Sequence, residues 1–255
     1  MLFLLLIRAF DFILLNGTAS GIGAGTAVAD WRHALNFNPA QARFRGKIAG
    51  SVVYTTPYGL EGINCLRTET NFQFSRLGFG VGLQSLGLAG YGEYDIGSAF
   101  SFEIVDDFCG GVGAHALVRN LKEYGLELIP AFDFGMVWQI SRLQLGVAVQ
   151  QLNKPKYKNG DELLPSFRAG IGWEPVKAAL LAVDIEKKGE DERLVSGVEL
   201  RIFPEVKVRA GLETAPWCLR AGIGLNWNWL GVDYGYQYHP ELGDTHIIGL
   251  SCRWN

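Results

Sequence analysis

The stretch from Leu219 to Trp227, LRAGIGLNW, has an apolar residue at almost every second position and small, polar or charged residues between them. The runs GVDYGYQYH, from Gly231 to His239, and IIGLSCRW, from Ile247 to Trp254, repeat this alternation. A period of two residues is that of a β-strand, whose side chains point alternately to two faces. A continuous apolar face backed by glycine and charge is typical of a membrane barrel, whose outside meets lipid and whose inside meets water.

The composition agrees with a barrel of strands. The chain of 255 residues contains 33 glycines, and 12% of its residues are aromatic and 19% charged. An average soluble domain has about 25% charged residues and about 7% glycine. The mean hydropathy is +0.11, but no apolar run reaches the roughly 18 residues that a membrane helix needs. The chain is therefore expected to cross a membrane with strands.

Alternation and turn residues predict about fourteen strands from Lys47 onward. They lie near residues 47–55, 61–74, 76–86, 91–105, 110–120, 126–140, 142–151, 166–174, 177–187, 193–203, 205–213, 218–228, 230–239 and 245–254. The longer links fall on one rim and the short turns on the other, as in outer-membrane barrels. The longest link, between Gln151 and Pro165, is expected to be a solvated loop. The predicted fold is all-β, a transmembrane antiparallel up-and-down β-barrel formed by residues 47–255.

Residues 1–20 are expected to be a signal peptide, because an apolar stretch precedes the small residues Gly17-Thr18-Ala19-Ser20. Arg8 and Asp11 interrupt the apolar stretch. The alternative is a hydrophobic tail packed against the barrel.

Residues 21–46 are rich in alanine and lack strict alternation, so they are predicted to form a plug instead of a strand. A short helix is expected over residues 25–34. It ends before Asn38-Pro39, because a residue that precedes proline disfavours the helical conformation.

Ionisable residues recur at inward-facing positions of successive strands. They are Arg168, Glu199, Arg201, Lys207, Arg209, Glu213, Arg220 and Asp233, together with Asp184 and Glu186. Strands adjacent in sequence pair in a meander, so opposite charges are expected to form cross-strand pairs. Either these residues fill a wet lumen structurally, or they line a constriction or a substrate path. No ligand-binding residue is singled out among them.

Glycines share one face of several predicted strands, as Gly78, Gly80 and Gly82 do, and likewise Gly111 and Gly113. Because they lack side chains, such positions let a plug approach the wall or let the sheet bend. The alternative interpretation is a kinked lateral gate for an apolar ligand.

Enzyme activity is not expected. The four histidines, His33, His115, His239 and His246, are dispersed, and the sequence has neither a GxSxG nor an HExxH motif. No catalytic residue, metal site or cofactor is therefore predicted. The four cysteines lack CxxC spacing. A net charge of −3 without a basic cluster argues against nucleic acid as a partner.

Two segments carry a family resemblance. The region from Ala27 to Ala40, which ends in Asn38-Pro39-Ala40, resembles the plug of FadL-like transporters of hydrophobic compounds and of their PorV/PorQ-like relatives. The segments Val232 to Tyr236 and Glu241 to His246 resemble the closing strands and outer hairpin of the PorV-like group. The resemblance spans most of the chain after residue 20. It implies a plugged barrel of about 14 strands in the outer membrane of a Gram-negative bacterium.

Members of the two groups differ in function. FadL-like members pass hydrophobic molecules through the barrel and sideways into the membrane, whereas PorV-like members hold secretion cargo at the outer membrane. The resemblance therefore implies transport or binding of hydrophobic small molecules, or alternatively a membrane scaffold that acts through secretion-system proteins. A soluble all-β lipid-binding protein is the third alternative. Outer-membrane lipid and the barrel assembly machinery are further expected partners.

Overall fold

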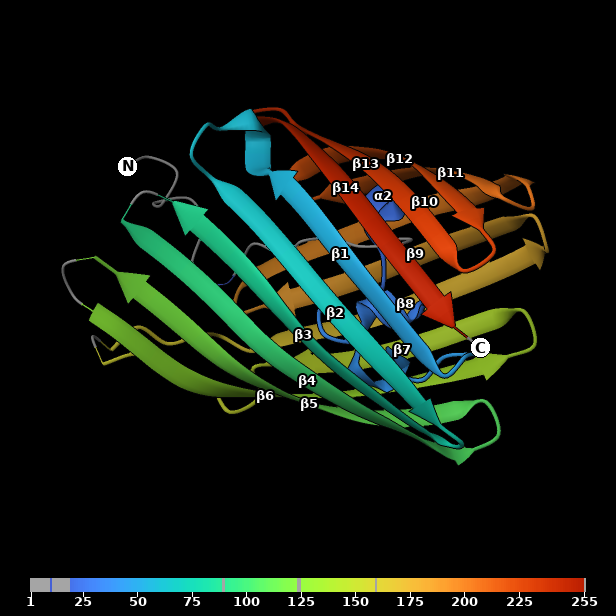
Figure 1. Cartoon of the computed structure of the whole chain (residues 1–255), viewed down its shortest axis with the longest axis horizontal. Helices are drawn as coiled ribbons and strands as arrows, with labels where there is room; N and C mark the ends of the chain where they lie inside the picture. The colour runs from blue at the N-terminus through green and yellow to red at the C-terminus, as the bar shows by residue number, and fades with distance from the viewer. Residues whose placement is uncertain (1–9, 11–18, 89, 123–124, 159, 255) are drawn as a thin grey trace.

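Fourteen antiparallel strands form a closed barrel in which each strand pairs with its neighbours in sequence and β1 pairs with β14 (Figure 1). The structure is a computed structural model and describes residues 10, 19–88, 90–122, 125–158 and 160–254. The strands are β1 (Ile48–Thr56), β2 (Asn64–Phe74), β3 (Leu77–Leu88), β4 (Tyr91–Val105), β5 (Phe108–Leu121), β6 (Gly125–Ile140), β7 (Leu143–Gln150), β8 (Ser166–Val176), β9 (Ala179–Lys188), β10 (Asp191–Phe203), β11 (Val206–Thr214), β12 (Trp217–Trp227), β13 (Leu230–His239) and β14 (Gly243–Trp254). The fold predicted from the alternation is confirmed.

The outer face of the barrel carries a band of exposed apolar side chains. On β8 and β12, for example, Ile171 is 51% exposed and Ile223 is 40% exposed. Trp229 and Trp254 stack at one end of the wall, with ring centroids 6.0 Å apart. Such a band, with aromatic rings at its edge, is the surface that a membrane barrel presents to lipid.

Among the described residues, no helix is both long enough and apolar enough to span a membrane.

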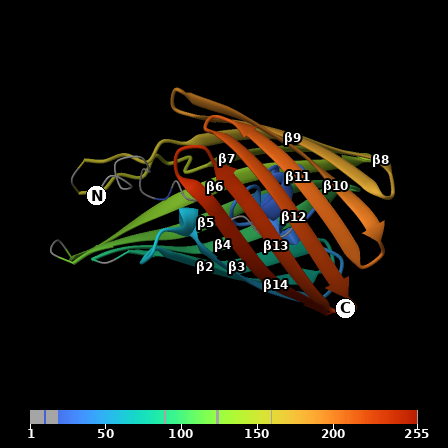
Figure 2. The same ribbon diagram turned by 90° about the horizontal axis from the view of Figure 1, so that it is seen from above.

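Residues 19–46 form a plug that lies inside the barrel, with the wall around it in both views (Figures 1 and 2). The plug contains the short helix α2 (Ala19–Ile22) and the 3₁₀ turns η1 (Trp31–His33) and η2 (Pro39–Ala42); a further turn, η3 (Pro57–Gly59), follows β1. Residues 1–9 and 11–18 of the expected signal peptide lie outside the described residues. The signal peptide therefore stays a prediction.

The helix predicted over residues 25–34 is wrong, because only Trp31–His33 forms a helical turn there. The backbone N–H groups of Gly25 and Thr26 both donate to Asp184 Oδ2 on β9, at 2.8 Å. The carbonyl groups of the same two residues accept from the Gln41 side chain at 2.7 and 2.9 Å. Side chains thus satisfy these backbone groups without a helix, including the two carbonyls that a helix would have used.

Inward-facing glycines let the plug come close to the wall. A Cβ atom added to Gly111 on β5 would overlap the backbone of Ala40, and one added to Gly78 on β3 would lie 2.5 Å from Arg43 N. The close approach predicted for these two glycines is confirmed. Their role is to leave room for the plug backbone, because any larger residue would have to displace it.

Strand pairing is incomplete between β6 and the strands that follow it. β7 has only eight residues and pairs with β6 from Phe134 to Ile140, so residues 125–133 of β6 have no strand partner on that side among the described residues. We call this region the wedge, and residues 151–165 the wedge loop. Pro130 lies in the unpaired part of β6, where a missing backbone N–H breaks no ladder.

The wedge loop covers the free edge of β6; most of its described residues are exposed, as the sequence predicts, but Tyr157 and Leu163 are buried. The Leu152 N–H donates to the Phe132 carbonyl at 2.9 Å, and the Asn153 amide donates to the Pro130 carbonyl at 2.9 Å. Tyr157 and Leu163 are 3% and 6% exposed, because they pack inward on the apolar cluster of Leu117, Ile129 and Ala131.

Candidate functional site

Two cavities of the lumen are lined in part by residues of the plug. The outer cavity, at the rim with the longer links, has a volume of about 480 Å³ and is lined by Leu35, His115, Asp133, Arg168, Glu186 and Arg193, among others. The inner cavity has a volume of about 550 Å³, and its lining includes Trp31, Gln41, Arg43, Glu199, Lys207 and Arg253. The two cavities share no lining residue. Among the described residues, these two cavities are therefore lined separately.

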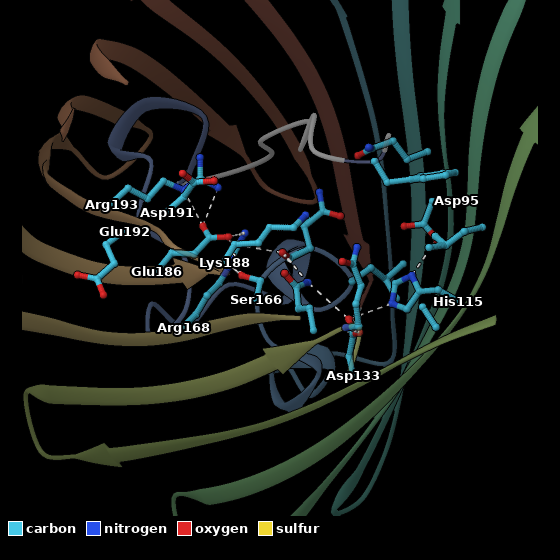
Figure 3. Close-up of a pocket in the computed structure, with 18 of the residues that line it drawn as sticks. Asp95, His115, Asp133, Ser166, Arg168, Glu186, Lys188, Asp191, Glu192 and Arg193 are labelled. Atoms are coloured by element: carbon cyan, nitrogen blue, oxygen red, sulfur yellow. Dashed lines mark hydrogen bonds and ion pairs between the residues drawn. The ribbon is translucent and has the colours of Figure 1, made fainter. Parts of the chain in front are cut away.

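One side of the outer cavity holds a histidine between two carboxylates (Figure 3). His115 on β5 places Nδ1 2.8 Å from Asp95 Oδ1 on β4 and Nε2 3.3 Å from Asp133 Oδ2 on β6. Asp133 also accepts a hydrogen bond from the Gln151 N–H at 2.9 Å, where the wedge loop begins. The cluster thus joins three strands to the start of the wedge loop.

The other side of the cavity carries alternating arginines and glutamates. Arg168 on β8 donates to Glu186 Oε1 on β9 at 3.0 Å, and Arg193 on β10 donates to Glu186 Oε2 and Glu213 Oε1 at 2.8 and 3.0 Å. Arg220 on β12 lies 2.6 Å from Glu213 Oε2. Among the residues predicted to face the lumen, Arg168, Glu213 and Arg220 are thus brought together in one chain of ion pairs.

The remaining predicted lumen residues gather below the outer cavity. Arg209 on β11 donates to Glu199 Oε2 at 2.8 Å and to Asp233 Oδ1 at 2.6 Å. Lys207 and Arg201 lie nearer the inner rim, 3.4 and 3.9 Å from Glu199 Oε1, and the Arg201 side chain is 42% exposed. These five residues form a second ionic group, which borders the inner cavity.

Arg32 of the plug completes this second group, although the sequence pattern does not point to it. Its guanidinium lies 2.6 Å from Asp233 Oδ2 and 2.7 Å from Asp30 Oδ2, and its side chain is 10% exposed. Arg32 therefore ties the plug electrostatically to β13.

We expect Arg32→Gln and Asp233→Asn each to lower the free energy of unfolding, because each leaves the other charge buried and without this partner. The double variant should lose less than the sum of the two, with a coupling free energy of about 1–3 kcal/mol. Urea unfolding of the barrel in lipid vesicles measures all three variants. Strictly additive losses would show that the two side chains do not act as a pair.

Asn38, in the predicted plug motif Asn38-Pro39-Ala40, is fully buried and bonds to the plug and to the wall. Its Oδ1 accepts from the Ala40 N–H at 3.1 Å and so caps η2. Its amide nitrogen donates to the carbonyls of Thr26, Met136 and Val147 at 3.0, 3.0 and 3.2 Å. Met136 and Val147 belong to β6 and β7, so this asparagine fixes the plug at the lower end of the wedge.

The sequence pattern does not single out the cluster of Asp95, His115 and Asp133. The alternation places all three residues on the inner face. Their meeting depends on the register of β4, β5 and β6, in which Asp95 and Leu117 are partners, as are His115 and Ala131. Within the described part of the chain, no group of three or more His, Cys, Asp or Glu side chains is arranged to hold a metal ion.

Comparison with solved structures finds chains that share the fold of this closed barrel of fourteen antiparallel strands. The chain is similar to the CymD monoaromatic hydrocarbon channel, with a TM-score of 0.75 at 12% identity over 97% of this chain and 99% of that one. It is also similar to a Pseudomonas aeruginosa FadL homologue (TM-score 0.69, 12% identity, 97% and 99% coverage). It is similar as well to the P. putida toluene transporter TodX, with a TM-score of 0.67 at 10% identity over 93% of this chain and 98% of that one.

At these identities the likeness establishes a shared fold. No protein-family model and no curated protein matches the sequence.

Proposed function

We propose that the protein is a FadL-like channel of the bacterial outer membrane that takes up hydrophobic small molecules and releases them sideways into the membrane. The observation that carries this proposal is the position of the outer cavity, directly behind the wedge. Ala131 and Asp133, on the unpaired part of β6, line the cavity together with Gln150 and Ser166, which flank the wedge loop. The cavity is thus separated from lipid by a loop and not by hydrogen-bonded strands.

The plug favours a sideways route over a straight one. It contacts the wall on different sides, through Asn38 on β6 and β7 and through Arg32 on β13. A straight passage would require the plug to lose both sets of contacts. A sideways passage requires only the wedge loop to move.

The membrane side of the wedge is apolar. Leu128 and Phe132 on β6 are 59% and 50% exposed, Leu152 in the wedge loop is 56% exposed, and Phe167 on β8 is 50% exposed. A hydrophobic molecule that leaves the cavity here meets these apolar side chains on its way to the hydrocarbon of the membrane.

A small set of contacts holds the wedge loop closed. The Arg119 guanidinium lies over the Tyr157 ring, 3.7 Å from its centroid, and 2.8 Å from Glu127 Oε2. Burial raises the pKa of the Tyr157 phenol, so the ring stays neutral under the arginine. A cation over an aromatic ring contributes about 0.5–2 kcal/mol, an amount that binding of a ligand can offset.

Uptake of naphthalene by Gram-negative cells that express the protein tests this route. Ala131→Trp places a large ring in the cavity behind the wedge and should abolish most of the protein-dependent uptake. Tyr157→Ala removes the Arg119 contact and should increase the uptake rate. Gln139→Trp, in the inner cavity, is the matched control and should leave the rate unchanged.

The folded state of each variant is checked by its heat-modifiable mobility on gels. Uptake that is blocked by Gln139→Trp but not by Ala131→Trp would contradict the sideways route. Uptake that responds to neither variant, together with stoichiometric recovery of a protein partner from native membranes, would favour the scaffold alternative.

A further inference from the structure

The outer cavity is not uniformly apolar, and its polar groups differ in how fully they are used. Leu35 of the plug, Leu117 on β5 and Ala131 on β6 supply apolar surface. The charged groups lie on two opposite sides, with His115 and its carboxylates on one and Arg168, Glu186 and Arg193 on the other (Figure 3). A ligand that fills the cavity therefore contacts both apolar and charged side chains.

The cationic groups of the cavity are already occupied. Arg168 donates to Ser166 Oγ, to the Asn36 carbonyl and to Glu186, while Arg193 donates to Glu186 and Glu213. Lys188, which also lines the cavity, has an interaction partner as well. An anionic ligand would meet arginines whose charge is already paired with Glu186 or Glu213, so it would lie next to carboxylates of the same sign.

Spare hydrogen-bonding capacity lies on the acceptor side. Asp95 uses one carboxylate oxygen, for His115, and the other accepts no hydrogen bond from the described residues; its side chain is 20% exposed. Gln151 Oε1 is buried and also has no partner among the described residues. A carboxylate accepts up to about four hydrogen bonds, so the cavity can take up donors without losing any existing contact.

The composition of the histidine cluster also favours a ligand that donates hydrogen bonds. Both ring nitrogens of His115 face carboxylate oxygens, and a neutral imidazole has only one N–H to donate. Even with a doubly protonated ring, two carboxylates face one cation. This side of the cavity thus has more carboxylate groups than cationic groups, beside the apolar surface of Leu117.

From this geometry we propose that the outer cavity selects amphipathic molecules whose apolar body carries a hydrogen-bond donor, with an ammonium group preferred over a hydroxyl. The donor binds the free oxygen of Asp95, and the apolar body lies against Leu35 and Leu117. Bare hydrocarbons bind more weakly, and carboxylates most weakly. This inference rests on the proposed function and names the ligand class of the same cavity.

Four ligands of nearly the same shape test the proposal: phenethylamine, 2-phenylethanol, ethylbenzene and phenylacetate. Their binding to the full-length barrel in lipid nanodiscs is measured by calorimetry. The expected order of affinity is phenethylamine, 2-phenylethanol, ethylbenzene and then phenylacetate. Asp95→Asn should weaken phenethylamine roughly tenfold to a hundredfold, as expected for loss of a hydrogen bond to a charged group, and should leave ethylbenzene unchanged.

Two further variants separate the specific contact from general electrostatics. Asp95→Glu keeps the carboxylate and should retain the preference for the amine. Glu192→Gln removes a charge that also lines the cavity but is paired with Lys187, and it should have no effect on the order.

If Asp95→Asn does not fold, the order of the four ligand affinities for the unsubstituted protein still tests the proposal. Ethylbenzene bound as tightly as phenethylamine, or phenylacetate bound best, overturns the inference while the proposed channel stands. Failure of all four ligands to bind overturns both.

Discussion

Alanine at both Gly111 and Gly135 should displace the plug and open the lumen to ions. The two glycines are direct partners across β5 and β6. A Cβ atom on Gly111 would overlap the backbone of Ala40, and one on Gly135 would overlap the Asn38 side chain and lie 2.9 Å from Pro39 Cδ. Neither contact is with the flexible end of a long side chain. The plug therefore has to move as a unit.

The cost of this displacement follows from the contacts of Asn38. Forced overpacking costs about 1–3 kcal/mol per site, and each hydrogen bond that Asn38 loses to Thr26, Met136 or Val147 contributes about 1 kcal/mol. These values are comparable with the total stability of many domains, about 5–15 kcal/mol. The wall itself needs no change, because its strands remain paired when the plug leaves.

Conductance across planar bilayers measures the result. We expect the unsubstituted barrel to stay closed and the double variant to show large, long-lived openings. Gly172→Ala is the control, because its Cβ would meet only the Gln144 side chain, at 3.4 Å. A double variant that stays closed and keeps its thermal stability would show that the plug adapts easily to the wall.

Arginine in place of Ile171 should block assembly of the barrel in membranes. Ile171 lies in the middle of β8 with its side chain 51% exposed on the lipid face. Arginine near the middle of the bilayer costs about 2–4 kcal/mol in a membrane barrel. Gly172, the next residue, faces the lumen with space around it, so Gly172→Ser should be tolerated.

The fraction of barrel that folds into vesicles, read from heat-modifiable mobility, distinguishes the two variants. Equal tolerance of both would remove the assignment of an outer and an inner face. The equivalent pair on β12, Ile223 and Gly224, is less suitable for this test. A Cβ atom at Gly224 would lie 2.8 Å from Arg209 Nη2 and 2.9 Å from Asp233 Oδ1. A serine at Gly224 would therefore disturb the ion pairs of the lumen.

The wall could be predicted from the sequence because a barrel strand has only two environments. Every residue of β13 faces either lipid or lumen, and the alternation from Leu230 to His239 gives the observed bounds of that strand. The period of two fixes the face of each residue without knowledge of its neighbours. The same argument places Arg209 and Asp233 inside but does not pair them, because pairing depends on the register of β11, β12 and β13.

The plug and the wedge loop could be predicted less well, because neither has a regular period. The backbone conformation after Gly25 is set by hydrogen bonds to the wall, chiefly to Asp184. These contacts between residues distant in sequence outweigh the local preference for a helix. In the wedge loop, Tyr157 and Leu163 are apolar residues among polar ones, a sign of burial that the overall polarity of the loop obscures. Pro130 marks the unpaired edge of β6 and is likewise visible only once the neighbouring strand is known to be short.

The pairing of β1 with β14 has a consequence for the order of assembly. The plug precedes β1 directly, and the Lys47 N–H, at the junction between them, donates to the Trp254 carbonyl at 2.8 Å. The first and last strands thus form the seam next to the point where the plug enters. A plug that is already in place when the seam closes does not have to slide past the inward-facing glycines of β5, β6 and β13, which it contacts closely. We therefore expect the sheet to curl around the plug, so that closing the seam encloses it.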